Sequence, residues 1–299
     1  MPIKRTFFSE QDQLPPGMAE AFVRAVNRYR RRAGVVVIDV GYRWVGGEMT
    51  DELAIRFHVR EKLAILPLRR RFPREIEGFP VDVIQSRAEL LCESAAAITA
   101  RRTALPLAGG HQCGAAGLVG TVGMLVRKTN KRYFISARHV LTGSLGTAVT
   151  HPGSGAGAAT VGTIAGSSSA HDAVLVRIAD SVGTTPVIHG GIALTGTCTP
   201  AIGQVVVKSG AASGLSKGRI DGRGVYTASG GFHVSSITPT DGCSVGTPGD
   251  SGTIWYEPTS RCAVGLLIAA TVPSTGPGAH GYATDVERIF STFSVTALT

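Results

Sequence analysis

The strongest constraint on the fold lies after Pro106, where short β-rich runs follow one another with glycine-rich segments between them. Val, Ile, Thr and aromatic residues favour strands, and glycine permits the tight turns that join them. Many short strands separated by turns are typical of an all-β sandwich or barrel. We therefore predict strands over Val119–Arg127, Tyr133–Ser136, Thr147–Thr150, Ala173–Ile178, Gln204–Ser209, Phe232–Ile237, Gly252–Tyr256, Ala263–Ala270 and Gly281–Asp285.

The first third of the chain combines one helical pattern with three strand patterns. Phe22, Val26 and Tyr29 form one apolar stripe at helical spacing, and Gly34 suits the end of a helix over Pro16–Arg32. Strands are predicted over three segments rich in β-branched or alternating apolar residues, Val35–Tyr42, Leu53–Val59 and Val81–Ile84. Residues 1–86 are thus predicted to form a small α+β domain.

Residues 87–104 are rich in Ala and Leu, and we interpret them as a linker or a short helix. The second domain then spans residues 105–299. Asp285–Phe293 is predicted to be a short helix near its end.

The formal net charge is +9, and the arginines crowd into the first third of the chain. A basic region can bind nucleic acid or an acidic partner. No interleaved aromatic residues and no helix-turn-helix pattern accompany this charge, so we interpret it as a solvated helix face and a solvated loop. Nucleic acid is therefore not an expected partner. The arginines concerned are Arg24, Arg28, Arg30, Arg31, Arg32, Arg69, Arg70, Arg71 and Arg74.

Two features bear on the compartment. No apolar run approaches the ~18 residues of a membrane span, and the segment Met1–Phe8 lacks the apolar core of a secretory signal. Free, mostly buried thiols in a reducing compartment are the simplest interpretation of the cysteines, which form no CxxC pair. We therefore predict a cytoplasmic protein with no metal site and no disulfide, not even between Cys243 and Cys262. The five cysteines are Cys92, Cys113, Cys198, Cys243 and Cys262.

A serine nucleophile is predicted within the run Gly249-Asp250-Ser251-Gly252. Glycine allows a backbone to turn its N–H groups toward one point, and two such groups can bind an oxyanion. The N–H groups of Gly249 and Ser251 are the candidate donors.

His139 is the best candidate for the base that activates Ser251. It follows the apolar strand Tyr133–Ser136, and a general base must be held rigidly where it can reach a cleft. His58 is expected on the polar face of a strand. The remaining histidines lie in Gly-, Ser- or Pro-rich surroundings and are expected to be exposed loop residues: His151, His171, His189, His233 and His280.

Asp172 is the candidate for the carboxylate that orients His139. It opens the strongly apolar strand Ala173–Ile178, which could anchor its side chain in the interior. An aspartate is also a common turn residue before a strand. Asp180 and Asp221 are rivals in looser, turn-like contexts.

The order His139, Asp172, Ser251 in a β-rich domain resembles the chymotrypsin-like serine proteases. Ser136–Leu141 resembles the family's histidine motif, Asp172–Ile178 its aspartate motif and Pro248–Gly252 its serine motif. The resemblance implies a double β-barrel over roughly residues 105–293, preceded here by the α+β domain. Val264–Leu267 and His280–Val286 resemble the strands that flank the substrate cleft in that family.

A closer resemblance, to bacterial trypsin-like proteins related to the plant narrow-leaf family, includes the first domain. It rests on Asp51–Lys62, Gly78–Ile84 and Val207–Ile220. This likeness implies that homo-oligomers can form. It does not define a substrate.

The resemblance implies a serine endopeptidase that acts on proteins or peptides through an acyl-enzyme and needs no cofactor. Val245 would lie near the base of the pocket for the residue before the cleaved bond, and Gly281 would line it, so a small or medium apolar residue is expected there. The aspartate that matches Asp250 pairs with a newly cleaved N-terminus in secreted relatives. We favour an internal partner for Asp250. The alternative is a new N-terminus made by cleavage before Leu107.

Two other functions remain open at this stage. A protease-like fold can serve as a scaffold that binds a peptide or protein with little turnover. Nucleic-acid binding through the first domain rests on charge alone. The complete set of His139, Asp172 and Ser251 favours the enzyme.

Overall fold

The computed structural model of the chain describes residues 7–62, 71–91, 93–94, 105–153, 157–188, 190–228, 231–240, 242–275 and 278–299. About half of the chain is strand and about 9% is helix. The predictions on Arg69, Arg70, Cys92 and His189 lie outside the described residues.

The C-terminal half contains a closed barrel of six strands. Each strand is hydrogen-bonded to the next, and the pairing of β18 with β19 closes the ring. In their order around the barrel, the strands are β18 (Val205–Gly210), β21 (Ile254–Tyr256), β22 (Cys262–Thr271), β23 (Gly281–Asp285), β20 (Phe232–Pro239) and β19 (Gly214–Tyr226).

A nine-stranded sheet, whose strands all precede this barrel in the chain except β24, has its own apolar interior, built around Phe134, Val174 and Val176. Its strands are mostly antiparallel neighbours joined by short connections. In sheet order they are β24 (Thr296–Ala297), β10 (Met124–Lys128), β11 (Lys131–Ala137), β14 (Ala173–Ile178), β13 (Ala159–Ser168), β12 (Ala148–His151), β8 (Gln112–Ala115), β9 (Leu118–Thr121) and β6 (Glu93–Ser94).

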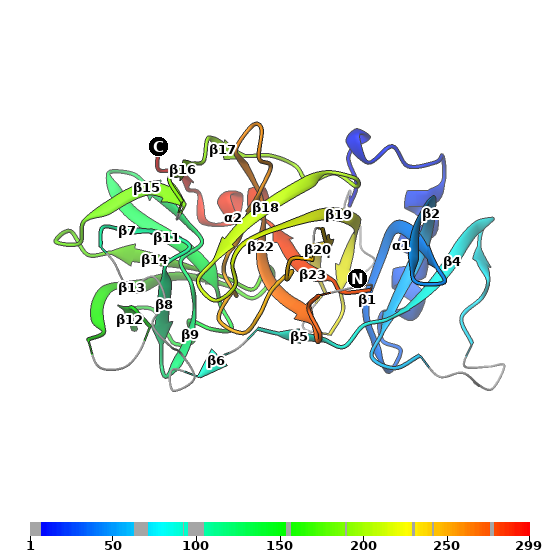
Figure 1. The fold of residues 1–299 in the computed structure, drawn as a ribbon, viewed down its shortest axis with the longest axis horizontal. Coiled ribbons are helices and arrows are strands. Elements are labelled where there is room, and N and C mark those ends of the chain that lie inside the picture. Colours follow the sequence, from blue (N-terminus) through cyan, green and yellow to red (C-terminus); the bar gives the residue numbers. More distant parts are fainter. Residues whose placement is uncertain are drawn as a thin grey trace.

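The N-terminal elements extend the sheet of the C-terminal barrel. Strand β1 (Val35–Val45) pairs with β19, and β2 (Glu48–Val59), β4 (Phe79–Gln85) and β3 (Glu75–Ile76) follow outward. Helix α1 (Met18–Tyr29) packs on this extension through Phe22 and Val26, after a short 3-10 turn at Glu10–Asp12. Figure 1 shows this region at one end of the molecule, the nine-stranded sheet at the other, and the closed barrel between them.

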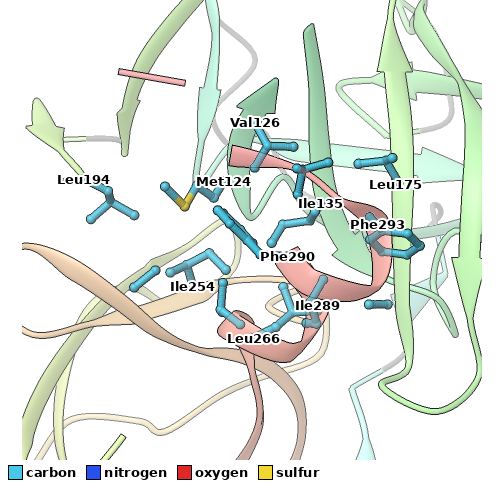
Figure 2. Close-up of a cluster of buried hydrophobic side chains, with 14 of the residues drawn as sticks. Met124, Val126, Ile135, Leu175, Leu194, Ile254, Leu266, Ile289, Phe290 and Phe293 are labelled. Carbon is cyan, nitrogen blue, oxygen red and sulfur yellow. The ribbon is translucent and has the colours of Figure 1, made fainter. Parts of the chain in front are cut away.

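Helix α2 (Val286–Phe293) joins the two β-structures. Figure 2 shows Ile289, Phe290 and Phe293 packed among side chains of the nine-stranded sheet, such as Ile135, and of the closed barrel, such as Leu266. These buried residues belong to one apolar cluster, so the two β-structures share a core.

Residues 87–104 contain strands, where the sequence favoured a linker or a helix. Strand β5 (Ala88–Leu90) pairs with β22, and β6 pairs with β9. No helix occurs in the described part of this stretch, because hydrogen bonds to two existing sheets override its Ala- and Leu-rich composition. A small sheet of β7 (Leu107–Gly109), β15 (Thr184–Ile188) and β16 (Ile192–Ala193), and the short strand β17 (Gly196–Thr197), complete the fold.

The prediction that the cysteines form no disulfide was wrong for one pair. Cys198 and Cys262 form a disulfide with their Cα atoms 5.6 Å apart, which the sequence separation of 64 residues concealed. Cys113 and Cys243 are free thiols, and burial raises the pKa of the Cys113 thiol to about 12. Among the described residues, no helix is long and apolar enough to cross a membrane.

A buried ionic network joins the N-terminal extension to the closed barrel. Arg56 on β2 donates to both oxygens of Asp39 on β1, at 2.6 and 2.8 Å, and to Asp221 on β19 at 2.7 Å. All three side chains are fully buried. The prediction of a turn-like context for Asp221 was therefore wrong.

His58 and His280 belong to the same network, so the expected polar strand face for His58 and exposed loop for His280 were wrong. Both are fully buried. His58 Nε2 lies 3.1 Å from Asp39, its Nδ1 lies 3.0 Å from the Tyr282 hydroxyl, and His280 Nε2 lies 3.0 Å from Asp221. Burial lowers the pKa of His58 despite the neighbouring carboxylate.

Candidate active site

The structure brings His139, Asp172 and Ser251 into one hydrogen-bonded line. His139 Nδ1 lies 2.5 Å from Asp172 Oδ2, and His139 Nε2 lies 2.7 Å from Ser251 Oγ. The carboxylate can accept only from Nδ1–H, so Nε2 is left to accept the serine proton. A proton can thus pass from the hydroxyl to the imidazole while Asp172 holds the ring.

The strands β11 and β14 position His139 and Asp172. These strands pair from Tyr133 to Ala137, and the Arg138 N–H continues the contact by donating to Asp172 O at 2.8 Å. Asp172 has a φ of 48°, a left-handed conformation that aspartate tolerates better than most residues. Its side chain is almost fully buried, as the strand-entry context predicted.

The turn that carries Ser251 is clamped by Thr121, which the sequence patterns did not single out. Thr121 N–H donates to Ser251 O and Thr121 Oγ1 donates to Gly249 O, both at 2.8 Å. Ser136 Oγ in turn donates to Thr121 O at 2.7 Å. Strand β9 therefore fixes the backbone on both sides of Asp250.

The same turn leaves two N–H groups unused. Asp250 N–H donates to Thr247 O, and Gly252 N–H donates to Leu267 O. Within the described parts of the chain, the N–H groups of Gly249 and Ser251 have no such acceptor. Gly249 has a φ of 93°, which favours glycine there.

Asp250 has an internal partner, as the sequence favoured. Lys208 Nζ lies 3.1 Å from Asp250 Oδ2, and both side chains are fully buried. Ser213 Oγ donates to the same oxygen, and the backbone N–H groups of Ala212 and Ser213 donate to Oδ1 at 2.9 Å. Burial alone would raise the pKa of Asp250, but the charge of Lys208 and these hydrogen bonds lower it.

A new N-terminus at Leu107 is therefore not required as a partner for Asp250. Leu107 itself is fully buried in β7, and its N–H donates to Gly183 O. Lys208 was missed because it lies 42 residues before Asp250 in a strand whose neighbours give no hint of a buried charge.

Val245 and Gly281 lie side by side next to this turn. A Cβ built on Gly281 would stand 3.1 Å from Val245 Cβ and 3.5 Å from Leu267 Cδ1, so a side chain there would be crowded against Val245. Val245 is fully buried in an apolar cluster with Leu267, Ala270 and Leu91. The surroundings of Val245 are therefore apolar.

The other candidates lie elsewhere. Asp180 is exposed and pairs with Arg177 and Lys131. His151 and His171 are buried, which corrects their assignment to exposed loops, and His233 stacks on Phe7. In the described ranges, no group of three or more His, Cys, Asp or Glu side chains is placed to hold a metal ion.

No protein-family model matches this sequence, and no curated protein sequence matches it either. Solved structures do match by fold. Protease A of Thermobifida fusca is 26% identical, with a TM-score of 0.52, and the match covers 64% of this chain and 98% of that protein. A glutamic acid-specific serine protease is 19% identical, with a TM-score of 0.54 and coverage of 64% and 100%. A Nocardiopsis protease is 22% identical, with a TM-score of 0.51 and coverage of 64% and 98%.

These neighbours define the class of the fold: this chain has the double β-barrel of the bacterial chymotrypsin-like serine proteases. The match leaves about a third of the chain unaccounted for.

Proposed function

We propose that this protein is a serine endopeptidase in which Ser251 is the nucleophile, His139 the general base and Asp172 the residue that orients the base. The observation that carries this proposal is the unbroken hydrogen-bonded line from Asp172 through His139 to Ser251. Groups with the same roles perform acyl transfer on several unrelated folds. The fold neighbours named as serine proteases support the same reaction class.

In this mechanism His139 Nε2 takes the proton of Ser251 while Oγ attacks the carbonyl carbon of the scissile bond. The oxygen of the tetrahedral intermediate becomes negative, and the free N–H groups of Gly249 and Ser251 are placed to receive it. One such donor is worth about 3–4 kcal/mol of transition-state stabilisation. His139 then gives the proton to the leaving amine, and water releases the acyl group in a second cycle.

The pair of Lys208 and Asp250 supports this role for Gly249. Six polar contacts hold the Asp250 carboxylate in one place: those from Lys208, the hydroxyls of Ser213 and Thr247, and the N–H groups of Ala212, Ser213 and Thr247. Asp250 lies between the two proposed oxyanion donors in the chain, so fixing its side chain restrains the backbone that carries both N–H groups. These contacts support a turn that works without a new N-terminus.

The apolar surroundings of Val245 favour an apolar residue before the cleaved bond. A charged side chain would lose its hydration there without gaining a partner. The likeness to narrow-leaf relatives and the homo-oligomers it implies stay predictions from sequence. So does the cytoplasmic location, against which the Cys198–Cys262 disulfide argues, because disulfides persist mainly in oxidising compartments.

Hydrolysis of a fluorogenic peptide library tests this proposal. The full chain should cleave, and Ser251→Ala should lose ~10⁴-fold or more in kcat/KM, as nucleophile removal does in related triads. Ser144→Ala changes an exposed loop serine and is the matched control, which should retain activity. Equal activity of the wild type and Ser251→Ala would reject the proposal.

A second candidate function is a binding scaffold with little turnover. It is favoured by one observation: Ser251 is fully buried, and only 8% of the His139 side chain is exposed. A peptide from outside would not reach the serine in this arrangement. A chain that binds peptides with unchanged affinity after Ser251→Ala and never cleaves them would support the scaffold.

A further inference from the structure

Near Ser251, the edge of β22 that β21 leaves unpaired is covered by the chain's own strand β5. Along its first half β22 pairs with β21, up to Leu266. Beyond that point β5 takes the same edge, with Ala269 opposite Leu90, Ala270 opposite Glu89 and Thr271 opposite Ala88. The pairing is antiparallel, so β5 runs toward the Leu267 end of this edge, where Gly252 N–H binds Leu267 O.

Leu91, the residue after β5, and the proposed nucleophile Ser251 both contact the carbonyl oxygen of Ile268. Its N–H donates to Ile268 O at 3.4 Å, and Ser251 Oγ lies 3.3 Å from the same oxygen. The direction of β5 therefore brings the segment toward Ser251 with the carbonyl group of Leu91 as its last group. This is the polarity that acyl transfer to a serine requires.

The Leu91 side chain fills the apolar pocket beside Val245. It is 3% exposed and belongs to the same buried cluster as Val245, Leu267 and Ala270. A Cβ built on Gly246 would stand 2.8 Å from Leu91 Cδ1, so the glycine leaves the space that the leucine occupies. Leu91 is thus surrounded by apolar side chains and by a glycine that leaves room for it.

Two residues after Leu91, the chain pairs with β9 of the nine-stranded sheet. Glu93 lies opposite Val119 and Ser94 opposite Leu118 in the pairing of β6 with β9, and β9 also holds Ser251 through the Thr121 N–H. Figure 1 shows β5 along the closed barrel and β6 beside β9 in the nine-stranded sheet. The backbone is paired on both sides of the peptide bond that follows Leu91.

We propose that this protein is its own first substrate and cleaves itself after Leu91, with Ala88–Leu91 as the acyl side of the bond. The inference rests on the proposed function of Ser251. It also explains why Ser251 is buried, because the segment covers it until the bond is cut. Strand β5 borders an open groove of about 640 Å³ lined by Arg60, Glu61 and Tyr226 among others, into which the segment can move once Leu91 withdraws from its buried cluster.

The reaction is a hydrolysis and balances with one water. Ser251 Oγ bonds to the Leu91 carbonyl carbon, the bond to the next nitrogen breaks, and His139 passes the serine proton to that nitrogen. Water then splits the ester and leaves Leu91 with a carboxylate. The products are residues 1–91 and 92–299, and the hydrogen bonds of β1 with β19 hold the two fragments together.

Intact-mass and terminal sequencing of the full chain test the inference. The wild type should yield the two fragments, while Ser251→Ala should stay a single 31.0 kDa chain. Newly made wild type from cell-free synthesis should be cut at a rate that a hundredfold dilution does not change, because the substrate is in the same molecule. A cleavage rate that falls with dilution would overturn the intramolecular step.

Variants of Leu91 separate this inference from the proposed function. Leu91→Asp should slow self-cleavage by ~10²-fold or more, because a carboxylate is disfavoured in the apolar pocket. Leu91→Met should be cut like the wild type. Leu145→Asp makes the same change at a leucine that is 69% exposed, and it should be cut normally.

Labelling by a fluorophosphonate probe shows which claim fails. If the wild type stays intact and labels, self-cleavage is overturned but Ser251 remains the nucleophile. The same conclusion holds if the wild type stays intact without labelling while the Leu91→Asp variant labels. If neither protein labels nor is cut, the proposed function fails together with the inference. Cleavage at another bond, with Leu91 internal to a fragment, would also overturn it.

Discussion

Lys208 Nζ lies 3.1 Å from Asp250 Oδ2 in the fully buried space beneath the turn that carries Ser251. This ion pair links β18 to the residue between the two proposed oxyanion donors, Gly249 and Ser251. Gly210 makes room for it, since a Cβ there would overlap the Asp250 carboxylate. The pair therefore couples the stability of the closed barrel to the shape of the turn.

Lys208→Met should damage both stability and activity. It leaves Asp250 buried without a cation, and breaking a buried pair in this way costs about 3–5 kcal/mol. Urea unfolding and peptide hydrolysis measure the two effects, with kcat falling more than KM rises because the oxyanion donors act in the transition state. Lys131→Met, at an exposed pair with Asp180, is the control. Unchanged kcat in folded Lys208→Met would contradict the role of the pair.

The free energy of unfolding should fall as the pH drops. The pKa of Asp250, Asp39 and Asp221 is lowered in the folded protein, since nearby Lys208 or Arg56 outweighs the effect of burial. A carboxyl with a lowered folded pKa stabilises the fold above its unfolded pKa of about 4 and loses that contribution below it. His58 acts in the same direction from its unfolded value near 6.5, because its folded pKa is also lowered.

Denaturant titrations at a series of pH values from 7 to 3 check this dependence. The account predicts a modest decrease below about pH 6.5 and a steeper one below about pH 4. A stability that stays constant down to pH 3 would contradict the assignment of these groups as ionised partners in the fold.

Arg56→Met should destabilise the junction between the N-terminal extension and the closed barrel. Arg56 is the cation that binds both Asp39 and Asp221 in the buried network. Its loss leaves two carboxylates facing each other, at an expected cost of about 3–5 kcal/mol in urea unfolding. Arg43→Met breaks an exposed pair with Glu52 and should leave the midpoint of urea unfolding almost unchanged. Equal effects of the two variants would show that the buried network adds no stability.

Peptides that copy the chain's own segment should be good substrates for the cleaved protein. Acetyl-Ala-Glu-Leu-Leu-aminomethylcoumarin matches Ala88–Leu91, and an arginine or aspartate in place of the final leucine should lower kcat/KM by ~10²-fold or more. The reason is the apolar pocket around Val245. A strong preference for Lys or Arg in a peptide library would contradict this specificity.

The candidate site was predictable because three local signals, each moderate alone, occur in the expected order within one β-rich domain. His139 and Asp172 each stand at the end of an apolar strand, and Ser251 lies in a glycine-flanked turn. Strands β14 and β23 occur where the sequence predicted them. The predicted strand Val119–Arg127 is two strands, β9 and β10, because Gly123 lies where a Cβ would meet the backbone of Gly252 and Ile135.

The long strand β19 was not predicted, because glycines and charges interrupt its pattern. The structure shows why these positions of β19 are glycines. A Cβ at Gly222 would overlap the Arg56 guanidinium, and one at Gly224 would overlap β1 at Asp39. The glycines admit a buried ion pair from another strand, which is a tertiary relationship that local propensity does not encode.

The most direct test of the account is the location of a covalent adduct. The full chain, or Leu91→Asp if the wild type stays intact, is reacted with a fluorophosphonate, digested and examined by mass spectrometry. The account predicts one adduct, on Ser251, that disappears in Ser251→Ala and is strongly slowed in His139→Ala. An adduct on another residue, or equal labelling of the wild type and Ser251→Ala, would contradict the claim that Ser251 is the nucleophile.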